Sequence, residues 1–348
     1  MSDRIPTLDG WRGVAVIIVL LHHYELYFDN RLLTYPWAWI GQHGVTMFFV
    51  VSGYLITTNL LGNGDLKRFY VRRFFRLMPA AWVYLATVCL LAVFMPHKVT
   101  VGRDILGCLF FFRNYIGLNV PTNFTGHFWS LSIEEQFYFV WPTLLVLLGR
   151  RKSAAVAVLG IATIVAYRAL HPACMAQGFD YFFGTEYRLD AIMVGCLLAF
   201  VMSDVRARGW ITEHSALLFW ACVPVVAFDF WRYQSVMPLH ENVALALMLA
   251  STVTNSRLIA SRVLELPHLK TTGMLCYGIY LWQGLLLRQV FDPFGFILMP
   301  VAVLGSWALI EQPCQRLGLR LLKRSVQNVS KVEPGAGSRE RTLGLIGH

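Results

Sequence analysis

The sequence predicts an all-α fold, a polytopic transmembrane bundle of about ten helices. Of the 348 residues, 56% are hydrophobic and only 14% are charged, whereas soluble domains carry about 25% charged residues. The mean hydropathy is +0.53. Apolar runs recur from residue 8 to about residue 314, each near the length that crosses a hydrocarbon core.

The expected spans follow one another along the chain and are separated by short polar loops. They are residues 9–26, 42–61, 77–95, 130–149, 154–170, 187–203, 215–231, 241–255, 272–290 and 296–313. A shorter apolar stretch at 104–117 contains Arg113 and Asn114. We expect it to be a re-entrant or interfacial segment, which is permitted where protein covers the backbone.

The basic residues predict the orientation of the spans. With the N-terminus inside, every inner loop contains Lys or Arg, as the positive-inside rule requires. Counting 104–117 as a full span would place Arg150, Arg151 and Lys152 outside. We therefore expect a multi-pass protein with both termini in the cytoplasm. The net charge of +10 resides in these loops, so it indicates topology and lipid contact and argues against nucleic-acid binding.

Residues 1–324 are expected to form one transmembrane domain, and the polar residues 325–348 a disordered cytoplasmic tail. The seven cysteines are scattered singly along the sequence. None belongs to a C-x-x-C motif or a Cys/His cluster with metal-ligand spacing, so we expect no metal site.

The first span contains two ionisable residues, Arg12 and His23. Eleven helical positions return to within about 20° of the start and rise about 16 Å, so both side chains share one face, whereas His22 points away from it. Ionisable residues are costly in a bilayer and usually mark a site. A neutral imidazole can take the proton of a hydroxyl, as acyl transfer to an alcohol requires. The alternative is that Arg12 anchors at the interface and His23 bonds a neighbouring helix.

A basic loop runs from Lys67 to Arg76. If it is helical, Arg73 and Arg76 lie one turn apart and can clamp one anion, as guanidinium groups do with phosphates. The alternative is a positive-inside stop signal that contacts lipid headgroups.

A third motif, residues 126–138, is expected at the outer end of a span. Ser132 and Glu135 match a capping box, which would give Glu135 a structural role. Trp129 and the aromatic residues after it match an interfacial belt. Glu134 has no such structural explanation. A carboxylate there, on the acceptor side of the membrane, can orient a histidine or hold sugar hydroxyls.

Weaker signals complete the pattern. Ser52–Gly53 either breaks a helix or permits close helix packing, and packing is the more common reason. Arg188 and Asp190 open a span from the outer side, where they can pair with other helix ends. Tyr280 lies in the ninth span, and Glu311 ends the tenth, where it can pair with an inner-loop arginine.

Taken in their order along the chain, these motifs resemble those of the acyltransferase-3 family of bacterial integral-membrane O-acyltransferases. The likeness covers most of residues 7–317. Seven motifs in register carry it: Leu8–Gly13 with His23, Phe48–Ile56, Arg73–Pro79, Trp129–Tyr138, Arg188–Ala191, Tyr280–Trp282 and Glu311–Pro313. One departure is Gln283, because the family often has a histidine directly after Tyr-Leu-Trp.

The resemblance implies about ten transmembrane helices, an acyl-CoA donor and acylation of a carbohydrate hydroxyl. By it, His23 is the catalytic base or an acyl relay, Arg12 is its partner, and Glu134 serves the acceptor side. The basic loop would bind the CoA phosphates through Arg72, Arg73 and Arg76. Further residues expected at the substrate are Trp129, Ser130, Glu135, Arg188, Asp190 and Tyr280.

We therefore expect an O-acetyltransferase of the bacterial inner membrane that uses acetyl-CoA as its donor and has no resident cofactor. Its acceptor would be a surface polysaccharide, such as an exopolysaccharide or O-antigen, or a lipid-linked precursor. The alternative is a transporter or flippase of a lipid-linked or anionic substrate, because intramembrane Arg, His and Glu also mark transport paths. A third interpretation is a non-enzymatic assembly scaffold. Acyl-CoA binding by the basic loop would separate an enzyme from a transporter.

Overall fold

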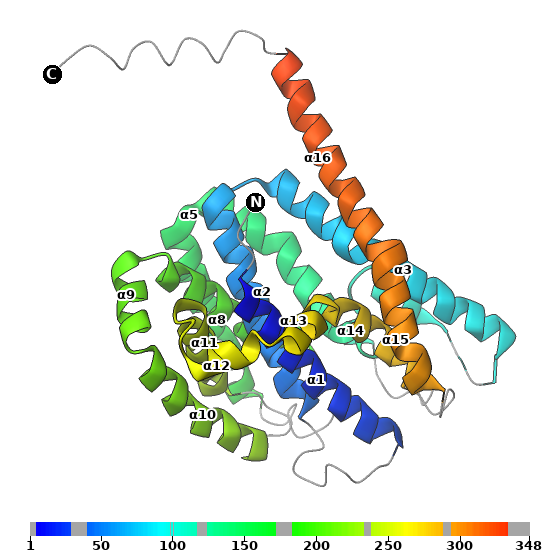
Figure 1. The fold of residues 1–348 in the computed structure, drawn as a ribbon, viewed down its shortest axis with the longest axis horizontal. Coiled ribbons are helices and arrows are strands. Elements are labelled where there is room, and N and C mark those ends of the chain that lie inside the picture. The colour runs from blue at the N-terminus through cyan, green and yellow to red at the C-terminus, as the bar shows by residue number, and fades with distance from the viewer. Residues whose placement is uncertain are drawn as a thin grey trace.

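The computed structural model describes residues 5–28, 40–97, 99, 101–116, 124–171, 183–232, 238–287 and 294–332. All regular elements in these ranges are helical, which confirms the all-α class. In chain order they are α1 (Pro6–Phe28), α2 (Gly41–Asn63), α3 (Leu66–Phe94), α4 (Arg103–Leu109), η2 (Arg113–Tyr115), α5 (Phe128–Leu170), α8 (Thr185–Met202), α9 (Val205–Glu213), α10 (Ser215–Arg232), α11 (Leu239–Thr254), α12 (Ile259–Leu264), α13 (Pro267–Met274), α14 (Cys276–Leu286), α15 (Gly295–Ser306), η4 (Trp307–Glu311) and α16 (Gln312–Val332). Figure 1 shows how they assemble into a bundle.

Five helices in the described part of the chain are long and apolar enough to cross a membrane. They are Gly41–Gly62, Leu66–Phe94, Phe128–Leu170, Ser215–Arg232 and Gly295–Lys323. The number of ten spans stays a prediction. The expected ninth span at 272–290 is not continuous, because α13 ends at Met274 and α14 begins at Cys276. The stretch 104–117 forms only the seven residues of α4 and the three of η2, both too short to span a hydrocarbon core.

The long helix α5 contains two of the expected spans. They meet at Gly149, whose φ of 70° is a left-handed conformation that glycine adopts without strain. Beyond this point Arg150 donates to the carbonyl of Phe200, near the end of α8, and Arg168 donates to that of Tyr187, near its beginning. The second half of α5 therefore runs antiparallel along α8.

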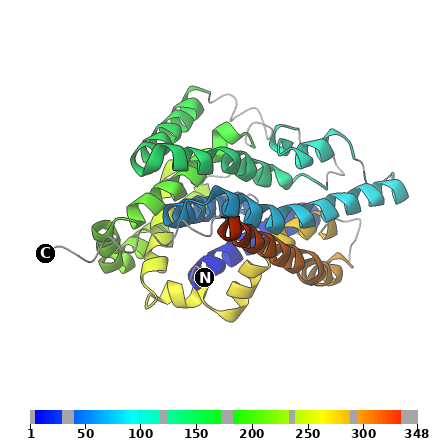
Figure 2. The ribbon, with the colours of Figure 1, turned by 90° about the horizontal axis from the view of Figure 1, so that it is seen from above.

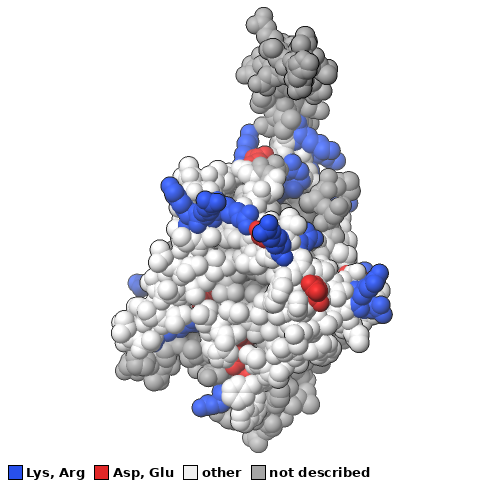
Figure 3. Space-filling view, turned by 90° about the vertical axis from the view of Figure 1, so that its left-hand side faces the viewer, with Lys and Arg blue, Asp and Glu red and all other residues white. Residues whose placement is uncertain are grey.

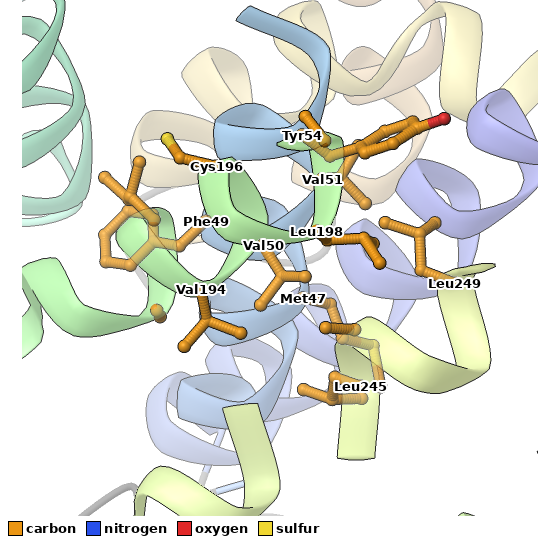
Figure 4. Packing of buried hydrophobic residues seen from close by; sticks show 14 of the residues in the cluster. Met47, Phe49, Val50, Val51, Tyr54, Val194, Cys196, Leu198, Leu245 and Leu249 are labelled. Atoms are coloured by element: carbon orange, nitrogen blue, oxygen red, sulfur yellow. The ribbon is translucent and has the colours of Figure 1, made fainter. Parts of the chain in front are cut away.

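Close approach of α2 to α8 forms the centre of the bundle. A Cβ on Gly53 would lie 1.9 Å from the Ile192 carbonyl, and one on Gly195 would lie 2.1 Å from the Val50 carbonyl. The Ser52–Gly53 pair thus permits helix packing within an unbroken α2, as expected. Buried side chains of α2, α8 and α11 interlock around this contact (Figure 4).

The N-terminal half of α1 packs equally closely on two short helices. A Cβ on Gly10 would lie 2.1 Å from the carbonyl of Leu264 in α12, and one on Gly273 of α13 would lie 1.7 Å from the carbonyl of Asp9. In addition, Trp11 donates to Thr252 of α11 over 2.9 Å. These contacts fix the depth and rotation of α1, and with them the direction of its ionisable residues.

The last three elements form one continuous rod, because α15 passes into the π-helical η4 and then into α16. Helix α16 lies alongside α3 (Figure 2). It continues to Val332, so residues 325–332, expected in the tail, are helical, while 333–348 lie outside the described residues. On the face in Figure 3, a band of Lys and Arg crosses the upper part of the described surface, and scattered charged residues interrupt a mostly uncharged surface below it.

Candidate functional site

Polar side chains gather at two levels along α1. Arg12 lies near its N-terminal end and His23 near its C-terminal end, about 16 Å apart for eleven helical positions. Helix α14 runs beside α1 in the same direction. The charge of Arg12 acts on Cys276 at the beginning of α14, and His23 contacts Gln283 near the end of α14. We call the first group the inner polar cluster; its members are Arg12, Arg73, Arg76, Glu134 and Glu135.

Arg73 is the centre of the inner polar cluster. Its Nε and Nη2 donate to Glu135 Oε1 over 2.9 and 2.5 Å, and Nη2 lies 3.5 Å from Glu134 Oε2. The guanidinium also stacks on the ring of Tyr138, 3.4 Å from the centroid. Two carboxylates and one aromatic face therefore hold this cation inside the protein.

Glu134 belongs to the same cluster. Its Oε1 accepts a hydrogen bond of 2.9 Å from Ser52 Oγ on α2, and the charges of Arg73 and Arg12 both act on it. The expectation that Glu134 marks an acceptor end remote from the arginines is therefore wrong. The reason is that side chains of α3 reach α5 at this level, since Arg73 pairs with Glu134 and Tyr70 donates to the Tyr138 carbonyl.

The interpretation of residues 126–138 as a cap and an aromatic belt is also wrong. Helix α5 begins at Phe128, so Ser132 lies in its second turn and donates back to the Phe128 carbonyl over 3.0 Å. Glu135 pairs with Arg73 instead of capping the helix. The expected belt residues are buried inside the bundle rather than turned to lipid; they are Trp129, Tyr138 and Trp141.

Arg73 and Arg76 do not converge on one anion. Arg76 is exposed, and no described residue lies within hydrogen-bonding or ion-pairing distance of it. The positive charge of Arg12 repels the Arg76 guanidinium, and the negative charge of Glu311 attracts it. Arg72 is exposed as well. The basic loop forms the first turns of α3, and there Arg72 and Arg76 are exposed whereas Arg73 is paired inside the protein.

His23 faces α14, where its Nδ1 lies 3.1 Å from Gln283 Oε1. An amide oxygen only accepts, so this contact is a hydrogen bond in the tautomer that carries its proton on Nδ1. His22 is turned toward α2, since a Cβ on Gly41 would lie 2.7 Å from its ring. The two adjacent histidines thus face different helices, as their helical offset predicts, although their ring centroids are 5.3 Å apart.

Three further groups surround the end of α14 next to His23. Tyr280 donates to the His127 carbonyl over 2.5 Å and lies 3.3 Å from Ser130 Oγ. The ring of His127 occupies the space that a side chain at Gly284 would fill, 2.1 Å from the ideal Cβ position. Ser130 and Tyr280 are thus bonded within the protein, to each other and to the His127 carbonyl, one helical turn before Gln283. Their expected role at the substrate stays a prediction.

Arg188 and Asp190 lie in a separate buried network. Asp190 accepts from Arg168 over 2.5 Å and from Asn242 over 2.9 Å, while Arg188 donates to Thr46 over 3.1 Å. The guanidinium of Arg188 also lies 5.7 Å from the ring of Trp129. These contacts match the expectation that Arg188 and Asp190 pair with other helix ends, and they join α2, α5, α8 and α11.

Sequence reasoning did not assign a role to three residues at the site. Gln283 was noted only as a departure from a family pattern, and Ser52 only for helix packing. His127 received no role, although it directly precedes α5. Their partners are distant in sequence, since Gln283 lies 260 positions from His23 and Ser52 lies 82 from Glu134. No local pattern contains such information.

Within the described ranges, no group of three or more His, Cys, Asp or Glu side chains is placed to hold a metal ion. The cysteines described there are all free, and none lies in a pair or cluster. The described residues of the site present imidazole, guanidinium, carboxylate and amide groups.

Comparison with known proteins agrees with the membrane acyltransferase character. The chain is 30% identical to a Bacillus subtilis protein named "Putative peptidoglycan O-acetyltransferase", over 92% of the chain and 56% of that protein. It is 30% identical to the peptidoglycan O-acetyltransferase of Listeria monocytogenes, over 80% of the chain and 49% of that protein. A Staphylococcus aureus protein named "Putative O-acetyltransferase" is 28% identical over 91% of the chain and 58% of that protein.

The chain thus spans about half the length of the curated relatives it matches. No solved structure matches it. Residues 5–311 match the sequence pattern of the family described as acyltransferase domain, and the match includes α1, the basic loop, α5 and α14. Both the extent of this match and the order of the motifs lead to one conclusion: the chain belongs to the acyltransferase-3 family.

Proposed function

We propose that this chain transfers an acetyl group from cytoplasmic acetyl-CoA to a hydroxyl group of a carbohydrate. The observation that carries the proposal is the placement of a half-buried His23 against Gln283 of α14, about 16 Å along one helix from the cationic end of the site. Membership of the acyltransferase family supports the same reaction class.

The donor would bind at the basic end of the bundle. Arg72 and Arg76 are exposed there and can pair with the phosphates of CoA, because guanidinium groups bind phosphate with charge-assisted hydrogen bonds. Arg73 would support this end indirectly, since Glu134 and Glu135 already hold it. The thioester arm would then reach into the bundle toward His23.

His23 would act on the acceptor hydroxyl. Its unprotonated Nε2 takes the hydroxyl proton while the oxygen attacks the thioester carbonyl carbon. The C–S bond breaks, and the CoA thiolate takes the proton from the imidazolium to leave as a thiol. In the alternative, a relay, His23 carries the acetyl group briefly before the hydroxyl accepts it.

The acceptor would be a surface carbohydrate or its lipid-linked precursor. Relatives named as peptidoglycan O-acetyltransferases favour a cell-wall glycan. An apolar groove of about 610 Å³ between α1, α14 and α15 supports a lipid-linked form, because Leu20 and Tyr24 beside His23 line it together with Ile279 of α14 and Leu287 just after it. A lipid chain in this groove would bring its sugar close to His23.

The site predicts a direct test with two neighbouring histidines. His23→Ala should lower acetyl transfer at least about a hundredfold, the contribution typical of a general base. His22→Ala, which alters the side facing α2, should retain most of the activity. The measurement is transfer of labelled acetyl from acetyl-CoA to purified cell-wall glycan, read by mass spectrometry, with membrane insertion checked by fractionation.

Acetylation at the wild-type level in the His23→Ala protein would contradict the proposed enzyme. Binding and movement of a lipid-linked glycan without any turnover of acetyl-CoA would support the transporter instead. A His23→Ala protein that no longer acetylates the glycan but turns over acetyl-CoA at the wild-type rate would be defective in transfer to the acceptor. That result would support the relay.

A further inference from the structure

We infer that Gln283 is the positioning residue of His23. Its side-chain oxygen keeps the imidazole proton on Nδ1 and so leaves Nε2 as the basic nitrogen. The inference rests on the proposed function of His23 and adds to it a residue, outside α1, that selects the tautomer and the ring orientation.

The contact itself defines the tautomer. His23 Nδ1 and Gln283 Oε1 are 3.1 Å apart, and an amide oxygen has lone pairs but no proton to donate. A neutral imidazole carries one proton, so a proton on Nδ1 leaves the lone pair on Nε2. Nε2 is then the atom that can accept the proton of a hydroxyl.

The burial of Gln283 shows what its carboxamide contributes. The residue is 0% exposed, and its Nε2 has no hydrogen-bond partner in the described part of the protein. An unpaired buried donor is unfavourable. A leucine or methionine would occupy a similar volume and would have no such donor. The contribution that an apolar residue cannot make is the oxygen that contacts His23.

Helix α14 holds this oxygen in place. Tyr277 donates to the Leu77 carbonyl of α3 over 2.7 Å, and Tyr280 donates to the His127 carbonyl over 2.5 Å. These bonds tie α14 to two neighbouring elements within two turns before Gln283. A rotation of α14 would also push Gly284 against the ring of His127. The acceptor for Nδ1 is therefore fixed before any substrate binds.

The tautomer can be measured directly in the unmodified protein. Nitrogen NMR of protein labelled at its ten histidines distinguishes protonated Nδ1 from protonated Nε2, and the signal of His23 is the one lost in His23→Asn. We expect the Nδ1–H form in the wild type and a shift toward the Nε2–H form in Gln283→Leu. A wild-type His23 in the Nε2–H form would overturn the inference.

Two substitutions distinguish positioning from packing. Gln283→Leu removes the acceptor and should lower kcat about ten- to a hundredfold, as loss of an orienting partner typically does, with little change in the KM for acetyl-CoA. Gln283→Glu keeps an acceptor and should retain more activity than Gln283→Leu. Simple packing inside a membrane would give the reverse order, because a buried carboxylate costs more than an apolar side chain. That reverse order would contradict the inference.

Gln136→Leu is the matched control. Gln136 donates to the Phe111 carbonyl and to Asn114, so its loss should lower the thermal stability and leave the His23 signal unchanged. The proposed function has its own test, because active His23→Ala protein contradicts that function. Inactive His23→Ala protein together with fully active Gln283→Leu protein contradicts only the role of Gln283.

Discussion

At the scale of single residues, the guanidinium of Arg73 lies inside the bundle and forms ion pairs with Glu134 and Glu135. The spacing of Arg73 and Arg76 predicted a common anion clamp, since one helical turn separates them. The structure instead pairs only Arg73 with the carboxylates of α5 and leaves Arg76 exposed. Under the proposed function, Arg76 and its neighbour Arg72 would therefore bind the CoA phosphates.

A first prediction concerns the stability of this ion pair. Arg73→Leu leaves two mostly buried carboxylates without their cation, so the free energy of unfolding should fall by about 3 kcal/mol or more. Thermal unfolding in detergent measures the loss. Adding Glu135→Leu to Arg73→Leu should recover part of it. A double variant whose loss equals the sum of the single losses would show that the pair is not coupled.

A second prediction concerns donor binding. Arg76→Ala should raise the KM for acetyl-CoA about ten- to a hundredfold, the loss expected for a charge-assisted hydrogen bond, and should leave thermal stability unchanged because the side chain is exposed. Arg151→Ala, at an exposed arginine of α5 two residues after Gly149, is the control for a general loss of positive charge. Equal effects of the two substitutions on KM would exclude a specific phosphate contact at Arg76.

At the scale of helices, the position of the site depends on glycines that allow close packing. Gly53 and Gly195 bring α2 against α8, and this contact orients Ser52 toward Glu134 on α5. The sequence predicted close packing at Ser52–Gly53 as the more common role of such a pair. It did not predict the partner helix, because a glycine marks where a backbone can approach and not which one does.

A third prediction compares two glycines of α2. Gly53→Ala would place a Cβ 1.9 Å from the Ile192 carbonyl, so the helices must move apart, at a cost of about 1–3 kcal/mol. Gly62→Ala meets nothing within 4 Å and should stabilise the helix by up to about 1 kcal/mol. Thermal unfolding of the two variants should therefore shift in opposite directions. A common direction would mean that the α2–α8 approach is not tight.

At the scale of the whole molecule, the basic loops predict which end of the bundle faces the cytoplasm. The turn at Gly149 brings the arginines that follow it to the same end as the final turns of α8, since Arg150 donates to the Phe200 carbonyl. An orientation with this end inside satisfies the positive-inside rule. It would also place Arg72 and Arg76 where cytoplasmic acetyl-CoA can reach them.

A fourth prediction tests this orientation by labelling from each side. Arg151→Cys should react with a membrane-impermeant maleimide only after the membrane is opened, and Arg103→Cys, exposed at the start of α4, should react in intact cells. Labelling is compared with that of the unsubstituted protein, which contains seven cysteines. Reaction of both variants from the same side would contradict the predicted topology.

The sequence by itself determined the helical membrane architecture and the shared face of Arg12 and His23. Both follow from local properties, since hydropathy is summed along a segment and the angle between two helical positions depends only on their separation. Only the tertiary structure decided which partners these residues have. Gln283 meets His23 across 260 positions, and Glu135 meets Arg73 across 62. Such pairs depend on the relative depth and rotation of packed helices, which no single segment specifies.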